Sequence, residues 1–468
     1  MTNLAYDDTN EKSIVKYAKK LVGKYIYEII DDDSYKVNIK NKGIIGNIIE
    51  EYYFGIKQNS SPEPDFEKVG IELKIIPLLQ QNKKIVVKER TKVCSINYTT
   101  LVNEQWSSSH AKKKLNKILF IYYLYNKEEI EKSEIKRVAL WNLSQDQSEL
   151  IIQDDWQRTK QKVLDGYAHL LSERYFNVLS PARSGQGGVD KVGKQRDLVP
   201  QPNQLYEKAA LKRAFTLKQS FTNQIWNELN AVKYESIIDS LKIDKIEEFE
   251  EKVLQSLNRF ESKSIDEIAS LFGIKILQGK NQVATVIKKA LGFKSVQAHI
   301  KEFEQLGIIV KTLKISAKRD TLLEAPSFPV LKLQEFEKEE FEESSFLSYI
   351  EKILFIPVYY EEEKRFLGKS FFWSPSDAQM NQIKKEWLIY QDEVKKGFCS
   401  VVKVTNNSPR GYKEVSKLSK ESQTEIIHLR PHARDSSDRD SDSHGNSIVK
   451  QSFWLNKKFL NALLKNQR

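Results

Sequence analysis

The sequence has few of the residues that build disulfide frameworks or soft-metal sites. Among 468 residues there are two cysteines and six histidines. Cys94 and Cys399 lie far apart in the chain and fit no metal-binding spacing, and the histidines show none either. These absences argue against a disulfide scaffold and against a cysteine or histidine metal site.

Long apolar runs and targeting signals are also lacking. The first residues are polar and acidic, and nowhere do about 18 apolar residues run together. We therefore expect no membrane span and a cytoplasmic protein with reduced thiols. Walker-type loops, Ser-His-Asp constellations and glycine-rich dinucleotide turns are absent. This excludes ATP-driven and hydride-transfer enzymes, and we expect no nucleotide cofactor.

What the chain does have is size and positive charge. Its length predicts two to three domains, and a hydrophobic content of 40% is enough for real cores. A net charge of +11 favours a polyanionic partner. Because this excess is spread among 64 acidic residues, it suits a folded DNA cleft better than a basic tail.

Two carboxylates and an amine occur together in residues 64–77, in the pattern Pro-Asp-x6-Glu-x-Lys. Alternating β-branched residues predict a strand over 69–76, so that Glu72 and Lys74 leave the same face. Asp65 can approach that face from the preceding loop. Two carboxylates there suit Mg²⁺, and a lysine beside the metal can orient water or offset phosphate charge. Glu-x-Lys alone is common on solvated strands, but the preceding Pro-Asp favours a nuclease.

These residues resemble the MutH mismatch-repair nickase and its relatives among type II restriction endonucleases that cut GATC. Residues 42–50 resemble the family's upstream helix, with a lysine at Lys42 and an acid eight residues later at Glu50. The run 107–120 resembles the family's helix-then-strand segment, with a lysine at Lys114. The similarities cover most of residues 10–225.

The resemblance implies the PD-(D/E)XK fold, a mixed β-sheet flanked by helices in the α/β class. It also implies Mg²⁺-dependent cleavage of double-stranded DNA at GATC. The implied roles are metal binding by Asp65 and Glu72, completion of the acidic site by Glu50, positioning of water by Lys74, and support of the phosphate by Lys114 and Lys42.

The sequence also contains an internal repeat. The pentapeptide at 117–121 returns unchanged 235 residues later at 352–356. Asp155-Trp156 is matched by Glu386-Trp387, and residues 213–221 are matched by 451–459. The helices predicted at 13–23 and 264–273 form a further candidate pair. Helices are also predicted at 43–53 and 155–173, and strands at 83–89 and 117–124.

We therefore predict two tandem PD-(D/E)XK domains, a catalytic one over 1–230 and a second over 255–468, joined by a linker at 231–254. In the second domain Ile309 takes the place of Glu72, while Lys311 persists in the place of Lys74. Lys288, Glu302 and Tyr349 stand where Glu50, Asp65 and Lys114 would be. We expect this domain to keep the fold but not the chemistry, and to act as an effector.

Two polar loops are predicted where the family has its recognition loop. The first covers residues 180–188 and continues to Arg196, and Arg183 is its best candidate for a guanine contact. The second covers residues 430–440, with Arg430, His432 and Arg434 as expected DNA contacts. Composition alone favours a flexible surface loop, but the position within the repeat favours DNA binding.

Two other functions remain open from the sequence. A MutH-like mismatch-repair nickase is one, although its usual form is a single copy of about half this length. A non-catalytic DNA-binding protein is the other, although the intact Asp65, Glu72 and Lys74 argue against it. The oligomeric state stays open between a monomer and a dimer induced by DNA.

Overall fold

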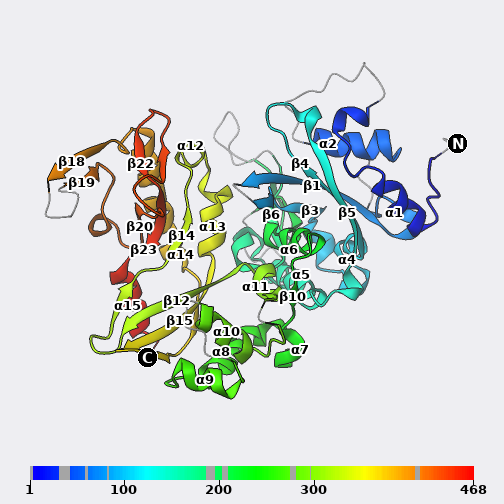
Figure 1. The fold of residues 1–468 in the computed structure, drawn as a ribbon. Coiled ribbons are helices and arrows are strands. Elements are labelled where there is room, and N and C mark those ends of the chain that lie inside the picture. Colours follow the sequence, from blue (N-terminus) through cyan, green and yellow to red (C-terminus); the bar gives the residue numbers. More distant parts are fainter. Residues whose placement is uncertain are drawn as a thin grey trace. The chain divides into compact units, whose positions relative to one another are not determined.

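The computed structural model describes residues 4–30, 43–57, 62–81, 84–185, 196–202, 209–274, 281–295, 297–405 and 412–467. The chain divides into two compact units, which are described separately (Figure 1). Among the described residues no helix combines the length and apolar character that a membrane crossing requires. Unit 1 comprises residues 1–238, 244–246 and 297–306, and unit 2 comprises 239–243, 247–296 and 307–468.

The main sheet of unit 1 has the order β2-β1-β4-β5. Its centre is a parallel pair, β1 (Glu72–Gln81) and β4 (Lys117–Leu124), with β2 (Lys84–Val87) and β5 (Glu134–Asn142) antiparallel at the edges. Six successive residues of β4 are buried, as expected for a strand covered on both faces. The strand predicted at 117–124 is confirmed. The strand predicted from 69 instead begins at Glu72.

Helices pack on this sheet through an isoleucine-rich core. The core includes α1 (Glu11–Lys19), α2 (Ile44–Asn47) and the π-helix η2 (Ile48–Tyr53). The helix predicted from Ser13 starts two residues earlier, because Asn10 is the N-cap and accepts hydrogen bonds from two backbone N–H groups. The helix predicted at 43–53 is confirmed, with a π-helical second half.

A three-stranded sheet, β3-β9-β6, completes the framework of unit 1. Its β6 strand begins beside the buried carboxylate of Asp155, on α5 (Glu149–Leu164). Asp155 accepts hydrogen bonds from the backbone N–H groups of residues 177, 178 and 179. This helix was predicted at 155–173, but it ends before Gly166, whose φ is +76°.

The remaining elements of unit 1 connect these layers. They are η1 (Ile26–Glu28), η3 (Glu67–Val69), β3 (Thr91–Ser95), α3 (Tyr98–Leu101), η4 (Trp106–Ser108), α4 (His110–Leu115), η5 (Ile130–Lys132), η6 (Leu143–Gln145), η7 (Ala168–Leu170), η8 (Glu173–Tyr175), β6 (Leu179–Arg183), β7 (Leu198–Val199), β8 (Ala210–Leu211), β9 (Arg213–Leu217), α6 (Gln219–Leu229), β10 (Tyr234–Glu235), β11 (His299–Ile300) and α11 (Lys301–Gln305).

Residues 297–306 pack within unit 1, although unit 2 precedes and follows them in sequence. Strand β11 pairs with β10, and the buried Glu302 accepts hydrogen bonds from the Ser236 hydroxyl and the Ile237 backbone N–H. Lys301 forms an ion pair with Asp146 at 3.1 Å. The segment containing Glu302, which was aligned with the Asp65 loop, is therefore built into the first unit.

Unit 2 repeats the strand arrangement of unit 1. Its main sheet has the order β13-β12-β15-β16, with β12 (Ile308–Ser316) parallel to β15 (Lys352–Glu361), the two long strands visible in Figure 1. A three-stranded sheet, β14-β23-β20, corresponds to β3-β9-β6. Glu386 accepts hydrogen bonds from the N–H groups of residues 425, 426 and 427, as Asp155 does at the start of β6. The match between Asp155-Trp156 and Glu386-Trp387 is therefore confirmed as a structural repeat.

One proposed pair of helices does not correspond. Lys117 of β4 forms an ion pair with Glu11 of α1, and the matching Lys352 of β15 forms one with Glu250 of α8 (Phe249–Asn258). The counterpart of α1 is thus α8, which starts within the predicted linker. The helix predicted at 264–273 exists as α9 (Ile265–Leu271), but it is the next element along the chain.

The other elements of this part of the chain complete unit 2 and the segment that links it in sequence to unit 1. They are α7 (Ile238–Leu241), η9 (Ile246–Glu248), α10 (Asn281–Ala290), β13 (Thr321–Glu324), β14 (Ser327–Val330), α12 (Leu333–Phe336), η10 (Phe341–Glu343), α13 (Ser345–Ile350), β16 (Lys364–Leu367), β17 (Phe371–Trp373), α14 (Asp377–Lys395), β18 (Val401–Thr405), β19 (Tyr412–Ser416), η11 (Glu421–Gln423), β20 (Ile427–Pro431), β21 (Arg439–Ser441), β22 (Ser447–Val449), β23 (Gln451–Leu455) and α15 (Lys457–Lys465).

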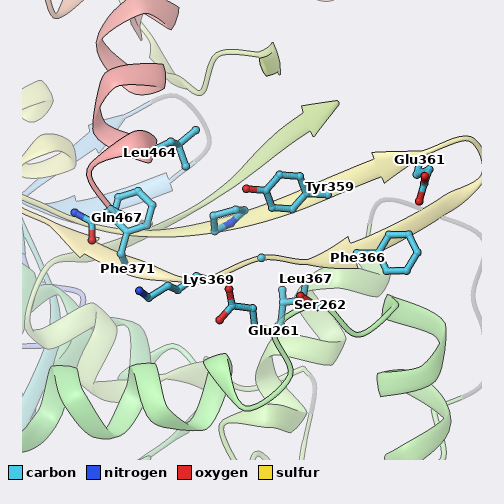
Figure 2. Close-up of a pocket in the computed structure, with 12 residues that line it drawn as sticks. Glu261, Ser262, Tyr359, Glu361, Phe366, Leu367, Lys369, Phe371, Leu464 and Gln467 are labelled. Carbon is cyan, nitrogen blue, oxygen red and sulfur yellow. The ribbon is translucent and has the colours of Figure 1, made fainter. Parts of the chain in front are cut away.

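The main sheet of unit 2 borders a pocket of about 580 Å³ (Figure 2). Pro357 of β15 and Leu464 of α15 line it, among others. At the corresponding positions of unit 1, the Trp226 ring packs against Tyr122 and its Nε1 donates to a main-chain carbonyl. Pro357 and Leu464 are smaller than Tyr122 and Trp226, the residues at these positions in unit 1.

Candidate active site

A tight loop before β1 brings Asp65 to the edge of the sheet. The short helix η3 ends at Gly70, whose φ of +67° turns the chain so that Phe66 bridges to Ile71. The Asp65 carboxylate then accepts a hydrogen bond from the backbone N–H of Leu73 at 2.8 Å. The expectation that Asp65 approaches the strand from its loop is confirmed.

Glu72 is the first residue of β1 and is only 2% exposed. One carboxylate oxygen accepts from Lys74 Nζ at 2.6 Å, and the other accepts from Lys114 Nζ at 2.9 Å. The two ammonium groups compensate a charge that burial would otherwise make costly. The structure therefore brings together Glu72, Lys74 and Lys114 from three separate positions of the sequence.

Lys114 reaches the site from the last turn of α4. The Ser109 hydroxyl caps this helix by accepting from the Lys112 N–H at 3.1 Å. Lys114 Nζ also donates to the main-chain carbonyl of Glu63 at 3.1 Å. Two acceptors thus hold the ammonium in place before any substrate is bound.

Glu50 joins the acidic group from the π-helix η2, a type of helix that is frequent at functional sites. Burial, followed by repulsion from Asp65, raises the pKa of Glu50 to about 6, while Lys74 opposes this rise. Burial and the Glu72 charge also raise the pKa of Asp65. The three carboxylates therefore repel one another at the end of β1.

The oxygen-rich donor set fits a hard divalent cation. Among the described residues no three Asp, Glu, His or Cys side chains form a ready-made metal cage. Mg²⁺ is commonly held by one or two carboxylates and keeps several waters, so it does not need such a cage. A cation beside Asp65 and Glu72 would relieve the repulsion that raises the pKa values of Asp65 and Glu50.

The corresponding place in unit 2 has no carboxylate on its strand. Ile309 lies opposite Ile353 in the parallel pair, as Glu72 lies opposite Ile118. Lys311 donates to the Ser327 carbonyl at 2.6 Å, and burial lowers its pKa. The lysine is kept, but it bonds to a main-chain group in place of a glutamate.

The predicted recognition loops begin as strands. Residues 179–183 form β6, and 427–431 form β20, so Arg183 and Arg430 lie on or at the end of a sheet strand. In the register of the paired strands, Arg430 of β20 takes the position that Ala182 has in β6. This position lies two residues beyond Ser180, where the predicted loop begins. Arg183 is exposed, and its cross-strand partner Arg213 donates to the Pro181 carbonyl at 2.7 Å. Lys42 and residues 186–195 lie outside the described residues.

In unit 2 two of the three predicted DNA-contact residues lie against a tryptophan. The Arg430 guanidinium lies 4.5 Å from the centroid of the Trp454 ring. His432 packs edge-on against the same ring and shares a hydrogen bond with the Ser452 hydroxyl at 2.9 Å. Arg434 is largely exposed and pairs with Asp435. The structure thus groups Arg430 and His432, while Arg434 lies apart from the ring contacts.

Sequence reasoning missed three positioning groups. Asp155 was noticed only as part of a repeat, yet it holds the start of β6. The Glu63 contact is made by a main-chain carbonyl, which carries no residue signature. Trp454 was matched to the first copy, but its contacts with Arg430 depend on pairing between β20 and β23.

A buried strand carboxylate between two lysines, with two more acids beside it, fits the active site of a phosphodiester-cleaving nuclease. The family described as DNA mismatch repair enzyme MutH matches residues 54–155 and again 291–386. Each match falls on one copy of the repeat. The family model therefore matches each copy of the repeat separately.

Individual relatives give the same result. The type II restriction enzyme Sau3AI of Staphylococcus aureus is 27% identical over 492 aligned positions, covering 96% of this chain and 97% of the relative. The DNA mismatch repair protein MutH of Serratia proteamaculans is 27% identical and covers 46% of this chain and 92% of its own length. MutH of Vibrio cholerae is 28% identical over a similar share. The chain is similar over nearly its whole length to a type II restriction enzyme and over each copy to the MutH family, and it is a site-specific deoxyribonuclease.

Proposed function

We propose that this restriction endonuclease cuts both strands of duplex DNA at GATC with Mg²⁺, using a single active site in unit 1. The observation that carries the proposal is Glu72, buried between Lys74 and Lys114 with Asp65 beside it. The GATC site follows from the resemblance of residues 64–77 and their neighbours to enzymes that cut it.

Each residue of the site in unit 1 is proposed to have a separate role in hydrolysis. Asp65 and Glu72 would hold Mg²⁺, which supplies a polarising charge and a bound water when present. Glu50 adds a third carboxylate that can accept a proton from water. Lys74 orients the attacking water, and Lys114 holds Glu72 and offsets the charge that develops on the phosphate. Lys42 is assigned the same supporting role on resemblance alone.

Unit 2 is proposed to be a second PD-(D/E)XK domain that binds DNA without cutting it. The shared strand order supports a common fold, and Ile309 in the place of Glu72 removes a principal metal ligand. Arg430, His432 and Arg434 are proposed to contact DNA there, and Arg183 in unit 1. Occupation of unit 2 by a second GATC would favour the cleaving state of unit 1 through its differential affinity.

Digestion of a sequenced plasmid with Mg²⁺, followed by mapping of the ends, tests this proposal. We expect linear products whose ends all fall at GATC, and no cleavage after chelation of the metal. Ends at unrelated sequences would refute the assigned site. Cleavage that persists after chelation would refute the metal assignment.

A MutH-like nickase is the second candidate, because Ile309 takes the place of Glu72 in unit 2 and leaves the strand carboxylate in unit 1 only, among the two aligned positions. One centre must act twice to break both strands, whereas a symmetric dimer has two. Nicked circles that never become linear would favour the nickase over the proposed double-strand cleavage.

A further inference from the structure

Unit 2 contains a two-stranded ribbon that has no counterpart among the described residues of unit 1. Strands β18 and β19 pair antiparallel over five positions between α14 and β20. In unit 1 the matching connection, residues 165–178, contains only the short helices η7 and η8. Figure 1 shows the ribbon projecting beyond β22 at the margin of unit 2. The repeat has therefore gained an element here that the catalytic unit lacks.

The ribbon and its flanks are strongly basic. The described residues 395–405 and 412–420 contain six lysines and one acid, Glu414. The connection as a whole, residues 396–405 and 412–426 among those described, contains five lysines and three acids, a net charge of +2. The matching connection of unit 1, residues 165–178, contains two acids and one arginine, a net charge of −1. The added connection is therefore more basic than its counterpart, and its lysines are concentrated on the ribbon and its flanks.

The base of the ribbon is fastened while its strands are exposed. The Lys417 N–H donates to the Phe398 carbonyl at 3.1 Å, and Arg439 forms an ion pair with Glu414 at 2.9 Å. Val402 is 64% exposed and Val404 43%. An anchored arm with exposed side chains can enter a partner's surface without first having to order itself.

The ribbon also forms a wall of a cleft that leads to the predicted DNA contacts. The cleft has a volume of about 950 Å³. Val401 and Val415 line it from the ribbon, Arg430 and Pro431 line it from β20, and Lys420 lies between them in sequence. The basic ribbon and the proposed DNA-binding strand therefore share one continuous surface.

We propose that the β18–β19 ribbon is a DNA-binding arm of unit 2 that lies in the major groove of the duplex held there. The major groove admits a two-stranded ribbon, and five residues of strand span about 17 Å. Lysines on the ribbon and its flanks contact phosphates of the groove walls, while Val402 and Val404 offer apolar contacts to base edges. This inference rests on the proposed DNA-binding function of unit 2.

Salt dependence of DNA binding tests the arm. The full chain carrying Glu72→Ala, which blocks cleavage, would be titrated with short GATC duplexes at several salt concentrations. Lys403→Gln with Lys417→Gln removes two exposed lysines of the arm and its base. Lys318→Gln with Lys364→Gln removes two exposed lysines elsewhere in unit 2 and is the matched control.

The arm variant should bind the second duplex about tenfold more weakly than its parent at moderate salt. Its plot of log affinity against log salt should be shallower by about 2, because each lost phosphate contact lowers the slope by about 0.9. The control should keep the parental slope. Equal slopes for parent and arm variant would overturn the proposal.

Two further variants separate the ways in which it can fail. Arg430→Ala tests whether unit 2 binds DNA at all, by counting duplexes per chain in sedimentation. If Arg430→Ala and the arm variant both bind two duplexes with parental affinity, the proposed function of unit 2 fails as well. If only Arg430→Ala weakens binding, the arm proposal alone fails. The double variant Val402→Thr with Val404→Thr tests whether the ribbon joins two chains. If it abolishes a dimer and leaves the salt dependence of DNA affinity unchanged, the ribbon mediates association of chains and the arm proposal is wrong.

Discussion

At the scale of single residues, the charge balance around Glu72 decides whether the site can act. Its carboxylate compensates two lysines that are themselves mostly buried. The same oxygens are proposed to bind the metal. Glu72 therefore accepts hydrogen bonds from the two lysines in the metal-free protein and would be a ligand in the metal-bound protein. Removing it therefore affects chemistry, stability and DNA affinity in different directions.

Glu72→Ala should lower the cleavage rate by more than about 100-fold, because a lost ligand costs more than a lost supporting contact. Binding to DNA should persist or tighten, since a negative charge near the phosphates is gone. The free energy of unfolding should fall, because Lys74 and Lys114 lose their common partner. Plasmid cleavage, gel retardation and thermal melting measure the three effects.

Glu63→Gln is the control for this variant. Only the main-chain carbonyl of Glu63 contacts Lys114, so the substitution should leave cleavage close to the parental rate. Cleavage by Glu72→Ala within tenfold of the parent in Mg²⁺ would mean that the site lies elsewhere.

Glu50 gives a prediction about pH. Its pKa is raised from 4.5 to about 6 in the folded protein. Its contribution to the free energy of unfolding is therefore fully present below pH 4.5 and is lost as the pH rises through 6. Without metal, Glu50→Gln should raise the melting temperature at pH 8 but not at pH 4.5.

In Mg²⁺ the parent enzyme should lose activity only as the pH falls below 6, because the bound cation lowers the pKa of Glu50 and a protonated Glu50 can no longer accept a proton or favour the metal. A melting temperature of Glu50→Gln that equals the parent's at both pH values would contradict the assigned environment of this carboxylate.

At the scale of elements, the loop from Asp65 to Ile71 positions Asp65, the proposed metal ligand. Gly70 has a φ of +67°, and a Cβ there would meet nothing within 4 Å. Alanine would fit sterically but would favour another backbone conformation, costing about 1 kcal/mol. The loop would then relax in a way that weakens the bond between Asp65 and Leu73.

Gly70→Ala should therefore lower cleavage about tenfold or more as well as destabilise the protein, since small displacements of catalytic groups are costly. Gly307→Ala is a matched control, because Gly307 has a φ of +64°, equally open space and the same place before β12. It should destabilise by a similar amount without loss of cleavage. Equal losses of activity in both variants would show that the effect comes from stability alone.

At the scale of the whole molecule, the proposed function gives the chain two DNA-binding units but one set of catalytic acids. If unit 2 is an effector, plasmids with one GATC should be cut at least several-fold more slowly than plasmids with two. A short GATC duplex added in trans should accelerate the one-site substrate. Initial rates of supercoiled-plasmid loss measure both effects.

Equal rates on the two plasmids, unaffected by the added duplex, would remove the effector role. Unit 2 would then act as the other half of a clamp around one site. Cleavage by residues 1–230 alone does not provide a clean test, because residues 297–306 supply packing to unit 1, including the pairing of β11 with β10.

The local pattern of the chain was enough to place the proposed site residues Glu72 and Lys74 side by side. Period-2 spacing places Glu72 and Lys74 on one face of a strand whatever the rest of the protein does. The pentapeptide repeated in β4 and β15 located the two copies, because a strand buried on both faces tolerates little change in its side chains. Ile309 in the place of Glu72 followed from the same register.

Only the tertiary structure decided which positions distant in sequence come into contact. The Glu63 carbonyl reaches Lys114 across 51 residues, and main-chain atoms carry no sequence signature. The correspondence of α8 to α1 within the repeat became visible only through the ion pairs Glu250–Lys352 and Glu11–Lys117. The start of β1 at Glu72 depends on the turn at Gly70, where backbone conformation overrides strand propensity. Spacing along the chain specifies a face of an element, whereas packing specifies which faces meet.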